Sequence, residues 1–428
     1  MAWSLFAFGA VYPWAAPPLL VLAALAAATA RARPRAHLVD AALLALPIGM
    51  ALQLVPLPPA LRHALAPSAD EFREAVRLIA PVDAWAPLTL DPSGTWVRLA
   101  LVVAAVALVF ATRARAQHDG RSIARWLGWM ALVAAIAGIG RSMLFPSGRI
   151  YGFWNPLEIG ASPFGVIINR NHYAAWAVVA VALTAGHLFA HAARVGAAVS
   201  PTRRHAALIA DGRILWMAFA VAVVAASIVF SASRSGFIGL LVAMAVLMAL
   251  AWRRMAGRGL AAGALLVLTC SAAAAMWASP ERLMDRIGDT TLMPGFRAEI
   301  WRESSALAAR YPLTGVGAGA YPAAMGYYQT RRDVFFNHAH NQYLEMAVEG
   351  GVLLSVPLLL VIAGAATAAG RGLASDAGSY FWLRAGAVAG LAGLAVLSLW
   401  ESPFRTPATL MVAAVAAGLA VAPPQSRQ

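Results

Sequence analysis

The amino-acid sequence predicts an all-α polytopic membrane protein, and its composition and its apolar runs carry that prediction. Of 428 residues, 61% are hydrophobic and only 12% are charged, whereas a soluble domain carries about 25% charged residues. The mean hydropathy is +0.69, and apolar runs of helix length recur along the whole chain. These observations exclude a soluble globular protein.

About twelve apolar segments are expected to form transmembrane helices. In chain order they cover residues 3–14, 17–30, 38–57, 95–112, 123–145, 173–192, 214–230, 237–252, 260–278, 343–369, 381–399 and 407–421. The first is short, and with the second it is expected to form a helical hairpin broken at Pro13, Pro17 and Pro18. The chain is accordingly divided into N-terminal transmembrane helices at 1–278, a large loop at 279–341 and C-terminal transmembrane helices at 342–428.

The arginines set the expected orientation, since all 33 basic residues are arginine. Clusters at 31–35, 113–125, 194–213 and 253–258, together with Arg371, fall on alternate connections. Because short cytoplasmic loops are enriched in basic residues, we expect these clusters and both termini to lie in the cytoplasm. The opposite face, the periplasm in a bacterium with an outer membrane, then receives 58–94, 146–172, 231–236, 279–341 and 401–406.

The large loop at 279–341 is polar and carries seven arginines. Its stretch AEIWRESSALAARY alternates apolar and polar residues with helical period, with Ile300, Trp301 and Leu307 opposed to Glu299 and Arg302. This pattern predicts an amphipathic helix lying on the bilayer. The following PLTGVGAGAYPAAM is expected to form a Pro/Gly-rich turn rather than a nucleotide-binding loop, because no strand precedes it and no Lys or Ser/Thr partner follows.

Two histidines stand where this loop meets the next transmembrane helix, in FFNHAHNQYLEMAVEGG. His338 and His340 precede the helix directly, and Asn341 is expected to be its N-cap. An imidazole changes charge near neutral pH, and at the mouth of a membrane helix it meets water on one side. We therefore interpret the pair as catalytic candidates.

Arginines approach the same membrane face from several segments. They are Arg170 in VIINRNHYAAW, Arg234 in the turn SASRSG, Arg297 and Arg302 on the amphipathic helix, and Arg331 and Arg332. Guanidinium groups bind phosphate through two parallel hydrogen bonds. A cluster of them at the lipid–water boundary suits a lipid-linked phosphate or diphosphate.

The sequence gives little support for metal or cofactor chemistry. The periplasmic segments contain no closely paired carboxylates, and His338 and His340 have no convincing third ligand. The single cysteine, Cys270, excludes a disulfide framework and a cysteine-based metal site. We expect no metal, no cofactor and no nucleic-acid partner.

Four of these stretches together resemble the O-antigen ligase and polymerase superfamily of bacterial membrane glycosyltransferases. They are HAHNQYLEMAVEGG, which resembles a His-Asn helix-start motif, the Ser-Arg turn SASRSG, the segment GFRAEIWRESSALAARYPLTGVGAGAY, and INRNHYAAW. The resemblance covers residues from about 165 to 405, whereas the first 150 residues match only in hydropathy.

The resemblance implies glycan transfer from undecaprenyl diphosphate at the periplasmic face of the inner membrane, without a metal or a nucleotide sugar. In this family a histidine is proposed to activate the acceptor hydroxyl and arginines to bind the donor diphosphate. The matching residues are His340, with His338 as the neighbour that could take the role, and Arg234, Arg297 and Arg170, with Arg302 on the same helix as Arg297. A direct displacement would invert the anomeric centre.

The resemblance leaves the acceptor open. A ligase would transfer to lipid A–core of lipopolysaccharide, a polymerase to a growing polysaccharide, and a protein O-oligosaccharyltransferase to a protein. Membrane lipids are expected partners in each case. A lipid-linked anion transporter is an alternative of another class, but the sequence shows no clear inverted repeat and its polar loop is very asymmetric.

Overall fold

The structure is a computed structural model that describes residues 1–30, 37–75, 85–144, 149–158, 161–252, 254, 293–376 and 378–424. Over these ranges the chain is all-helical, with isolated β-bridges as its only extended pairing. Seven of the described helices are long and apolar enough to cross a membrane. The predicted all-α fold with multiple membrane helices is confirmed.

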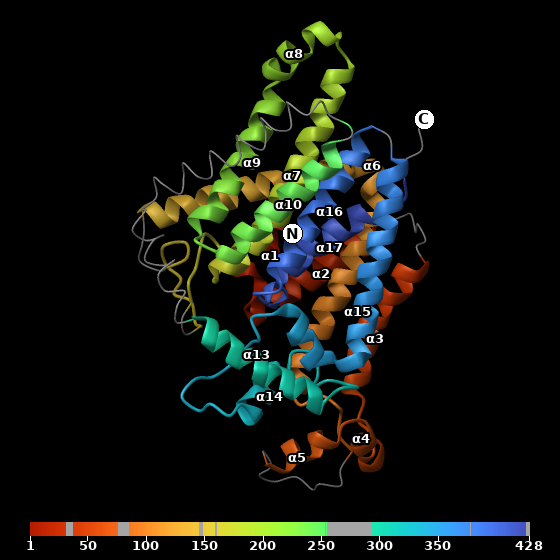
Figure 1. Cartoon of the computed structure of the whole chain (residues 1–428), viewed down its shortest axis with the longest axis vertical. Coiled ribbons are helices and arrows are strands. Elements are labelled where there is room, and N and C mark those ends of the chain that lie inside the picture. The colour runs from red at the N-terminus through yellow and green to blue at the C-terminus, as the bar shows by residue number, and fades with distance from the viewer. Residues whose placement is uncertain are drawn as a thin grey trace.

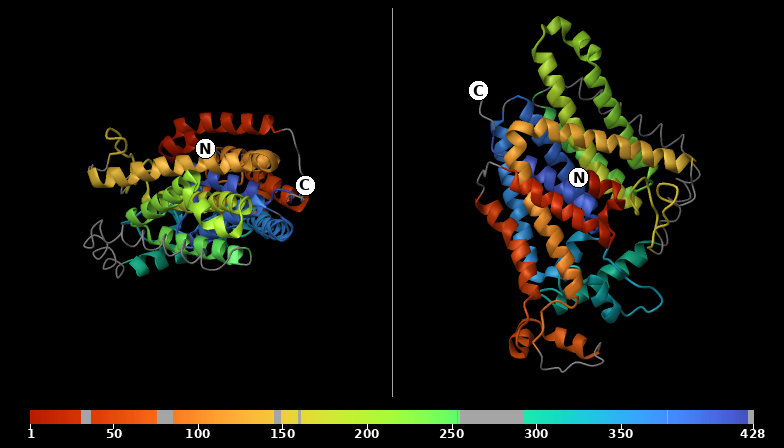
Figure 2. Two further views of the ribbon diagram at one scale, coloured as in Figure 1. Left: turned by 90° about the horizontal axis from the view of Figure 1, so that it is seen from above. Right: turned by 180° about the vertical axis from the view of Figure 1, so that it is seen from behind.

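The seven candidate spans and three shorter apolar helices form the main bundle. The spans are Pro92–Ala116 and His118–Met143, which are the two parts of α6 (Pro92–Leu144), and α7 (Arg170–Ala197), α9 (Gly212–Phe230), α10 (Arg234–Trp252), α15 (Gln342–Ser375) and α16 (Ser379–Leu397). The shorter helices are α2 (Ala16–Ala28), α3 (His37–Leu54) and α17 (Pro407–Ala420). The two parts of α6 run in different directions (Figure 2).

The described residues therefore account for fewer than the twelve expected spans. The segment at 3–14 forms only α1 (Ala2–Phe6) and two 3-10 turns, η1 (Phe8–Ala10) and η2 (Pro13–Ala15). Its backbone is broken by positive φ angles at Phe8, Gly9 and Ala10 and by Pro13, so no continuous helix forms. The expected span at 260–278 lies outside the described residues.

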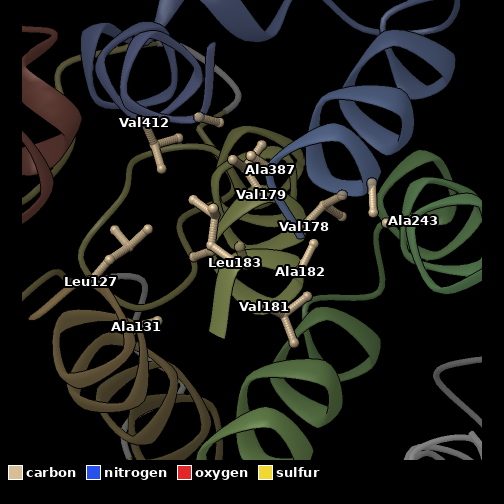
Figure 3. Packing of buried hydrophobic residues seen from close by; sticks show 14 of the residues in the cluster. Leu127, Ala131, Val178, Val179, Val181, Ala182, Leu183, Ala243, Ala387 and Val412 are labelled. Atoms are coloured by element: carbon tan, nitrogen blue, oxygen red, sulfur yellow. The ribbon is translucent and has the colours of Figure 1, made fainter. Parts of the chain in front are cut away.

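Helix α7 is the centre of the main apolar core. Its Val178, Val179 and Leu183 are fully buried and are surrounded by side chains of α6, α10, α16 and α17 (Figure 3). Glycines allow the closest approach: a Cβ added to Gly186 would lie 2.9 Å from the Cα of Gly386 on α16. Such small-residue contacts are typical of helix packing within membranes.

Polar segments gather at the two ends of the bundle. One end carries α4 (Pro59–Leu65), α5 (Pro67–Ala75), α13 (Met293–Arg310) and α14 (Tyr321–Tyr328), and the other carries η3 (Pro201–Arg203) and α8 (Arg204–Ala210) (Figure 1). Ala66 and Leu88 share a small apolar core with Ile300 and Tyr321. The described parts of segments 58–94 and 279–341, which the arginine pattern assigned to one face, therefore lie at one end of the molecule.

The amphipathic helix predicted from AEIWRESSALAARY is present as α13, but its apolar face is covered by protein. Its Ile300 and Leu307 are buried in the same small core as Tyr321, Phe336 and Val348. The apolar face of α13 therefore packs against the protein. Helical period shows that one face is apolar but does not show what covers it, which is why the expectation of a bilayer surface was wrong.

The Pro/Gly-rich turn at 312–319 is packed into a break in α15. Gly351 has φ 51° and ψ −149°, which interrupts the helix. The turn forms hydrogen bonds with the backbone groups of α15 that the break leaves without helical partners. The amide of Val352 donates to the Pro312 carbonyl at 2.8 Å, and the amide of Val316 donates to the Val348 carbonyl at 2.9 Å. This pairing joins α15, which begins directly after the two histidines, to the turn that connects α13 with α14.

Candidate active site

The histidine loop, His338–His340, is fixed by hydrogen bonds to the backbone of its middle residue, Ala339. Ala339, between the two histidines, is fully buried. Its amide donates to Glu345 Oε2 at 3.3 Å, and its carbonyl accepts a hydrogen bond from Trp301 Nε1 of α13 at 3.0 Å. The directions of His338 and His340 are thus set by α13 and α15 together.

Asn341 begins α15 as the sequence predicted. Its side chain accepts hydrogen bonds from the amides of Tyr343 and Leu344, each at 3.0 Å. The cap satisfies two of the amides that a helix start leaves free. Asn169 caps the start of α7 in the same way, by accepting from the Asn171 amide at 2.8 Å.

His340 faces a buried carboxylate. Its Nδ1 is buried, has no hydrogen-bond partner among the described residues and lies 3.9 Å from Glu401 Oε2. The residue has φ +50°, a left-handed conformation that is uncommon outside glycine. Its ring centroid is 3.9 Å from that of His338, so the two imidazoles form one unit.

Glu401 connects three separate elements. Its carboxylate is 4% exposed. Oε1 accepts a hydrogen bond from Asn171 Nδ2 of α7 at 2.8 Å and lies 3.5 Å from Arg297 Nη2 of α13, while Oε2 faces His340. One carboxylate thus meets an amide, a guanidinium and an imidazole.

A second ion pair, between Glu345 and Arg405, fixes the histidine loop. Glu345 is 1% exposed; its Oε1 accepts from Arg405 Nε and its Oε2 from Ser402 Oγ, each at 2.7 Å. Burial lowers the pKa of Arg405, but the carboxylates of Glu345 and Glu349 outweigh it and leave that pKa above its ordinary value. Arg405 therefore stays charged and fixes the carboxylate that holds the histidine loop.

His172 and His338 lie beside this cluster. His172 Nδ1 is hydrogen-bonded to Thr406 Oγ1 at 2.7 Å. Burial lowers the pKa of His338 to about 2, and the neighbouring His340 and Arg405 act in the same direction. His338 is therefore uncharged at neutral pH.

Of the four predicted donor-binding arginines, Arg297 alone contacts the Glu401 cluster through its side chain. Arg170 is the first residue of α7, and its amide donates to the Ser162 carbonyl at 2.8 Å. Arg302 is exposed on α13 and, within the described part of the chain, has no hydrogen bond or ion pair. Arg331 is paired with Glu299 at 3.0 Å, which compensates its charge.

Arg234 lies at the same end of the bundle with its charge uncompensated. It is the first residue of α10, it is exposed, and it makes no hydrogen bond or ion pair with the described residues. A Cβ added to Gly236 would lie 2.3 Å from the Cβ of Ala174, which places the start of α10 against the start of α7. Two helix N-termini, each with a partial positive charge, therefore stand beside two arginines.

Residues 219–359 match the family described as O-antigen ligase. Over this segment the chain is similar to O-antigen ligases. The matched segment contains Arg234, Arg297, Arg302 and both histidines of the loop, whereas Asn171 and Glu401 lie outside it. Comparison with curated proteins gave no match.

Three residues of this candidate site were missed by sequence reasoning. Glu345, Glu401 and Arg405 were treated only as parts of a helix and a loop, yet two of them lie in the short stretch WESPFRT after an apolar run. A charged residue at the boundary of a membrane helix is a functional candidate by default. That signal would have selected Glu401, but the sequence does not show that it meets His340.

Metal binding remains untested. Among the residues that the structure describes, no group of three or more His, Cys, Asp or Glu side chains is placed to hold a metal ion. The expectation of a metal-free reaction therefore stays a prediction.

Proposed function

We propose that this protein is an O-antigen ligase-type glycosyltransferase at the periplasmic face of the bacterial inner membrane. It moves a glycan from undecaprenyl diphosphate to a hydroxyl of lipid A–core. The observation that supports this best is the pairing of His340 with Glu401 beside Arg297, across the edge of an O-antigen ligase segment. Such a transfer requires a general base and a cation that stabilises the leaving diphosphate, and an imidazole oriented by a carboxylate next to an arginine supplies both.

In the proposed reaction His340 is the general base. Its Nδ1–H points at Glu401, which leaves Nε2 free to accept a proton. The observed 3.9 Å is too long for a hydrogen bond, and catalytic hydrogen bonds of this kind commonly tighten when substrate binds. Glu401 then fixes the tautomer and stabilises the imidazolium that forms.

The bond changes balance without any other reactant. The acceptor oxygen forms a bond to the anomeric carbon of the donor's first sugar and gives its proton to His340 Nε2. The bond from that carbon to the diphosphate oxygen breaks, and undecaprenyl diphosphate leaves with the electron pair. Attack opposite the leaving group inverts the anomeric centre.

The arginines act on the donor. Arg234, whose charge is uncompensated, and the starts of α7 and α10 offer an anion site, with Arg170 at the first position of α7. Arg297 joins this site to Glu401. Arg302 belongs to the proposal only as an outer contact, since its side chain is exposed on α13. Because these cations neutralise the leaving diphosphate, the proposal needs no metal ion.

The test is a transfer assay with purified protein, a lipid-linked oligosaccharide and lipid A–core, run with a chelator. The proposal predicts one glycan added to each acceptor. Products that lengthen on the donor lipid when lipid A–core is omitted would identify a polymerase instead. Absence of glycan transfer to either acceptor, with the lipid-linked donor moved across vesicles, would contradict the enzyme and favour a transporter.

A further inference from the structure

A second polar site lies at the end of the bundle that carries α8. A cavity of about 430 Å³ opens between α6, α7 and α9. The charged residues that line it are Arg121, Arg125, Arg194 and Arg213 against one acid, Asp119. Its lining therefore has an excess of positive charge.

This cavity is separate from the candidate active site. Both include residues of α7, His172 at one end and His187 toward the other. About 15 residues of helix at 1.5 Å per residue separate the two by roughly 22 Å. The cavity thus belongs to the arginine-rich end, which the proposed topology assigns to the cytoplasmic side.

Asp211 contacts His191, which lines the cavity, and its carboxylate is already hydrogen-bonded within the protein. Arg194 Nη2 lies 3.0 Å from His191 Nδ1, and because a guanidinium only donates, that nitrogen must be the acceptor. His191 Nε2–H therefore donates to Asp211 Oδ2 at 3.1 Å. Asp211 Oδ1 caps α9 by accepting from the amides of Arg213 and Ile214. Asp211 is thus committed to internal contacts, and the cavity keeps its positive character.

One buried polar atom in the cavity lining has no partner. His187 is 9% exposed, and its Nδ1 has no hydrogen bond within the described residues. A buried nitrogen left in this way costs free energy that a ligand would recover. An arginine bias that served only membrane orientation would not require a buried histidine or a cavity.

Two tryptophans form an amphipathic wall beside the arginines. The rings of Trp129 and Trp216 are stacked with centroids 4.1 Å apart, and both line the cavity. Tryptophan is enriched at the level of lipid headgroups, where one side of the ring meets apolar groups and the other meets water. This wall favours a ligand with a phosphate and an apolar portion over a fully soluble anion.

We propose that this cavity binds the phosphate of an anionic phospholipid headgroup. Arg125, Arg194 and Arg213 surround the phosphate, His187 Nδ1 donates to one of its oxygens, and the tryptophan pair packs against the glycerol and the first carbons of the acyl chains. Such a lipid would fill the gap between α7 and α9 and hold their ends together.

The experiment measures the midpoint of thermal unfolding of delipidated protein in detergent against added lipid. Phosphatidylglycerol should raise the midpoint, whereas phosphatidylcholine and inorganic phosphate at equal concentration should not. Arg125→Gln should require roughly tenfold more phosphatidylglycerol for the same shift, since it removes a charge-assisted hydrogen bond. Arg203→Gln is the matched control, because Arg203 is an exposed arginine at the same end outside the cavity, and it should respond as the natural protein does.

A second variant separates binding from folding. His187→Asn removes the imidazole from the cavity, and native mass spectrometry should find one phosphatidylglycerol fewer retained per chain. Equal stabilisation by both phospholipids, or equal responses of Arg125→Gln and Arg203→Gln, would overturn the proposal. Stabilisation by inorganic phosphate as strong as that by phosphatidylglycerol would also overturn it, because the lipid would then have no part in recognition.

Discussion

At the scale of single residues, the histidines and arginines could be selected from the sequence, but their partner could not. His338 and His340 are recognisable because they directly precede a helix whose N-cap, Asn341, can be identified from the adjacent sequence. Glu401 lies 61 residues beyond His340 in the chain (401 minus 340), and no local pattern reports a contact over that separation. Only the packing of α7, α13 and α16 shows that this carboxylate faces His340.

Arg234→Ala should weaken donor binding at least about tenfold while leaving stability unchanged. The arginine is exposed and has no partner among the described residues, so its loss breaks no internal contact, whereas a charge-assisted hydrogen bond to phosphate is worth about 1.5–3 kcal/mol. Arg234→Lys should restore only part of the affinity, because an ammonium cannot form the two-pronged contact. Donor titration and thermal unfolding measure both quantities; near-normal donor affinity in Arg234→Ala would remove this residue from the site.

His338 should make folding sensitive to acid. Its pKa is lowered from 6.5 to about 2 by burial, so below about pH 6.5 the unfolded chain binds a proton that the folded chain does not. The free energy of unfolding should therefore fall as pH falls, by up to about 1.4 kcal/mol per pH unit. His338→Asn lacks this proton, and its unfolding midpoint should change less between about pH 7.5 and about pH 5.

The control for this measurement is His205→Asn, which changes an exposed histidine on α8. It should keep the pH dependence of the natural protein. A pH dependence that is the same in all three proteins would show that His338 is not held neutral by the fold.

At the scale of elements, helix starts were predictable and helix breaks were not. Asn169 and Asn341 mark the starts of α7 and α15 in the sequence, because an N-cap is a contact between residues two or three apart. The break at Gly351 depends on the turn at 312–319, which inserts between the two parts of α15. A glycine pair in an apolar run is compatible with a straight membrane helix, so the sequence does not reveal the break.

Gly315→Ala should test whether this insertion holds the site together. Gly315 has φ +66°, and a Cβ there would lie 2.3 Å from the backbone carbon of Glu349. Because the obstacle is backbone rather than a flexible side chain, we expect a loss of at least about 2 kcal/mol in the free energy of unfolding. Gly140→Ala is the matched control, since a Cβ there would meet nothing within 4 Å. Equal unfolding midpoints for the two variants would show that the turn and the break are not tightly packed.

At the scale of the whole molecule, the arginine pattern identified which segments share an end. The small apolar core that joins the described parts of 58–94 and 279–341 agrees with it, and so does the cavity lined by arginines of α6, α7 and α9. The number of spans was less predictable, because apolar composition alone does not distinguish a membrane helix from the broken turns of 3–14. Hydropathy reports burial, and the break depends on backbone angles at Gly9 and its neighbours.

The orientation of the molecule can be measured by cysteine labelling. The chain has one cysteine, so a Cys270→Ser background accepts single reporters. Thr330→Cys, at an exposed position beside α14, should react with a membrane-impermeant reagent added to the periplasmic side. Arg203→Cys, at the opposite end, should react only after the inner membrane is opened. The reverse pattern would place the candidate active site on the cytoplasmic side and would contradict the proposed use of a donor at the periplasmic face.

The central claim is that His340, oriented by Glu401, takes the proton of the acceptor hydroxyl. The most direct measurement is the single-turnover rate of glycan transfer by the purified protein, with donor affinity determined separately. His340→Ala and Glu401→Gln should each lower the rate by about 10²–10⁴-fold and leave donor affinity within a few-fold, while His338→Ala should show the smaller defect. Normal turnover by His340→Ala with a dead His338→Ala would exchange the roles of the two histidines, and normal turnover by both would contradict general-base catalysis in this protein.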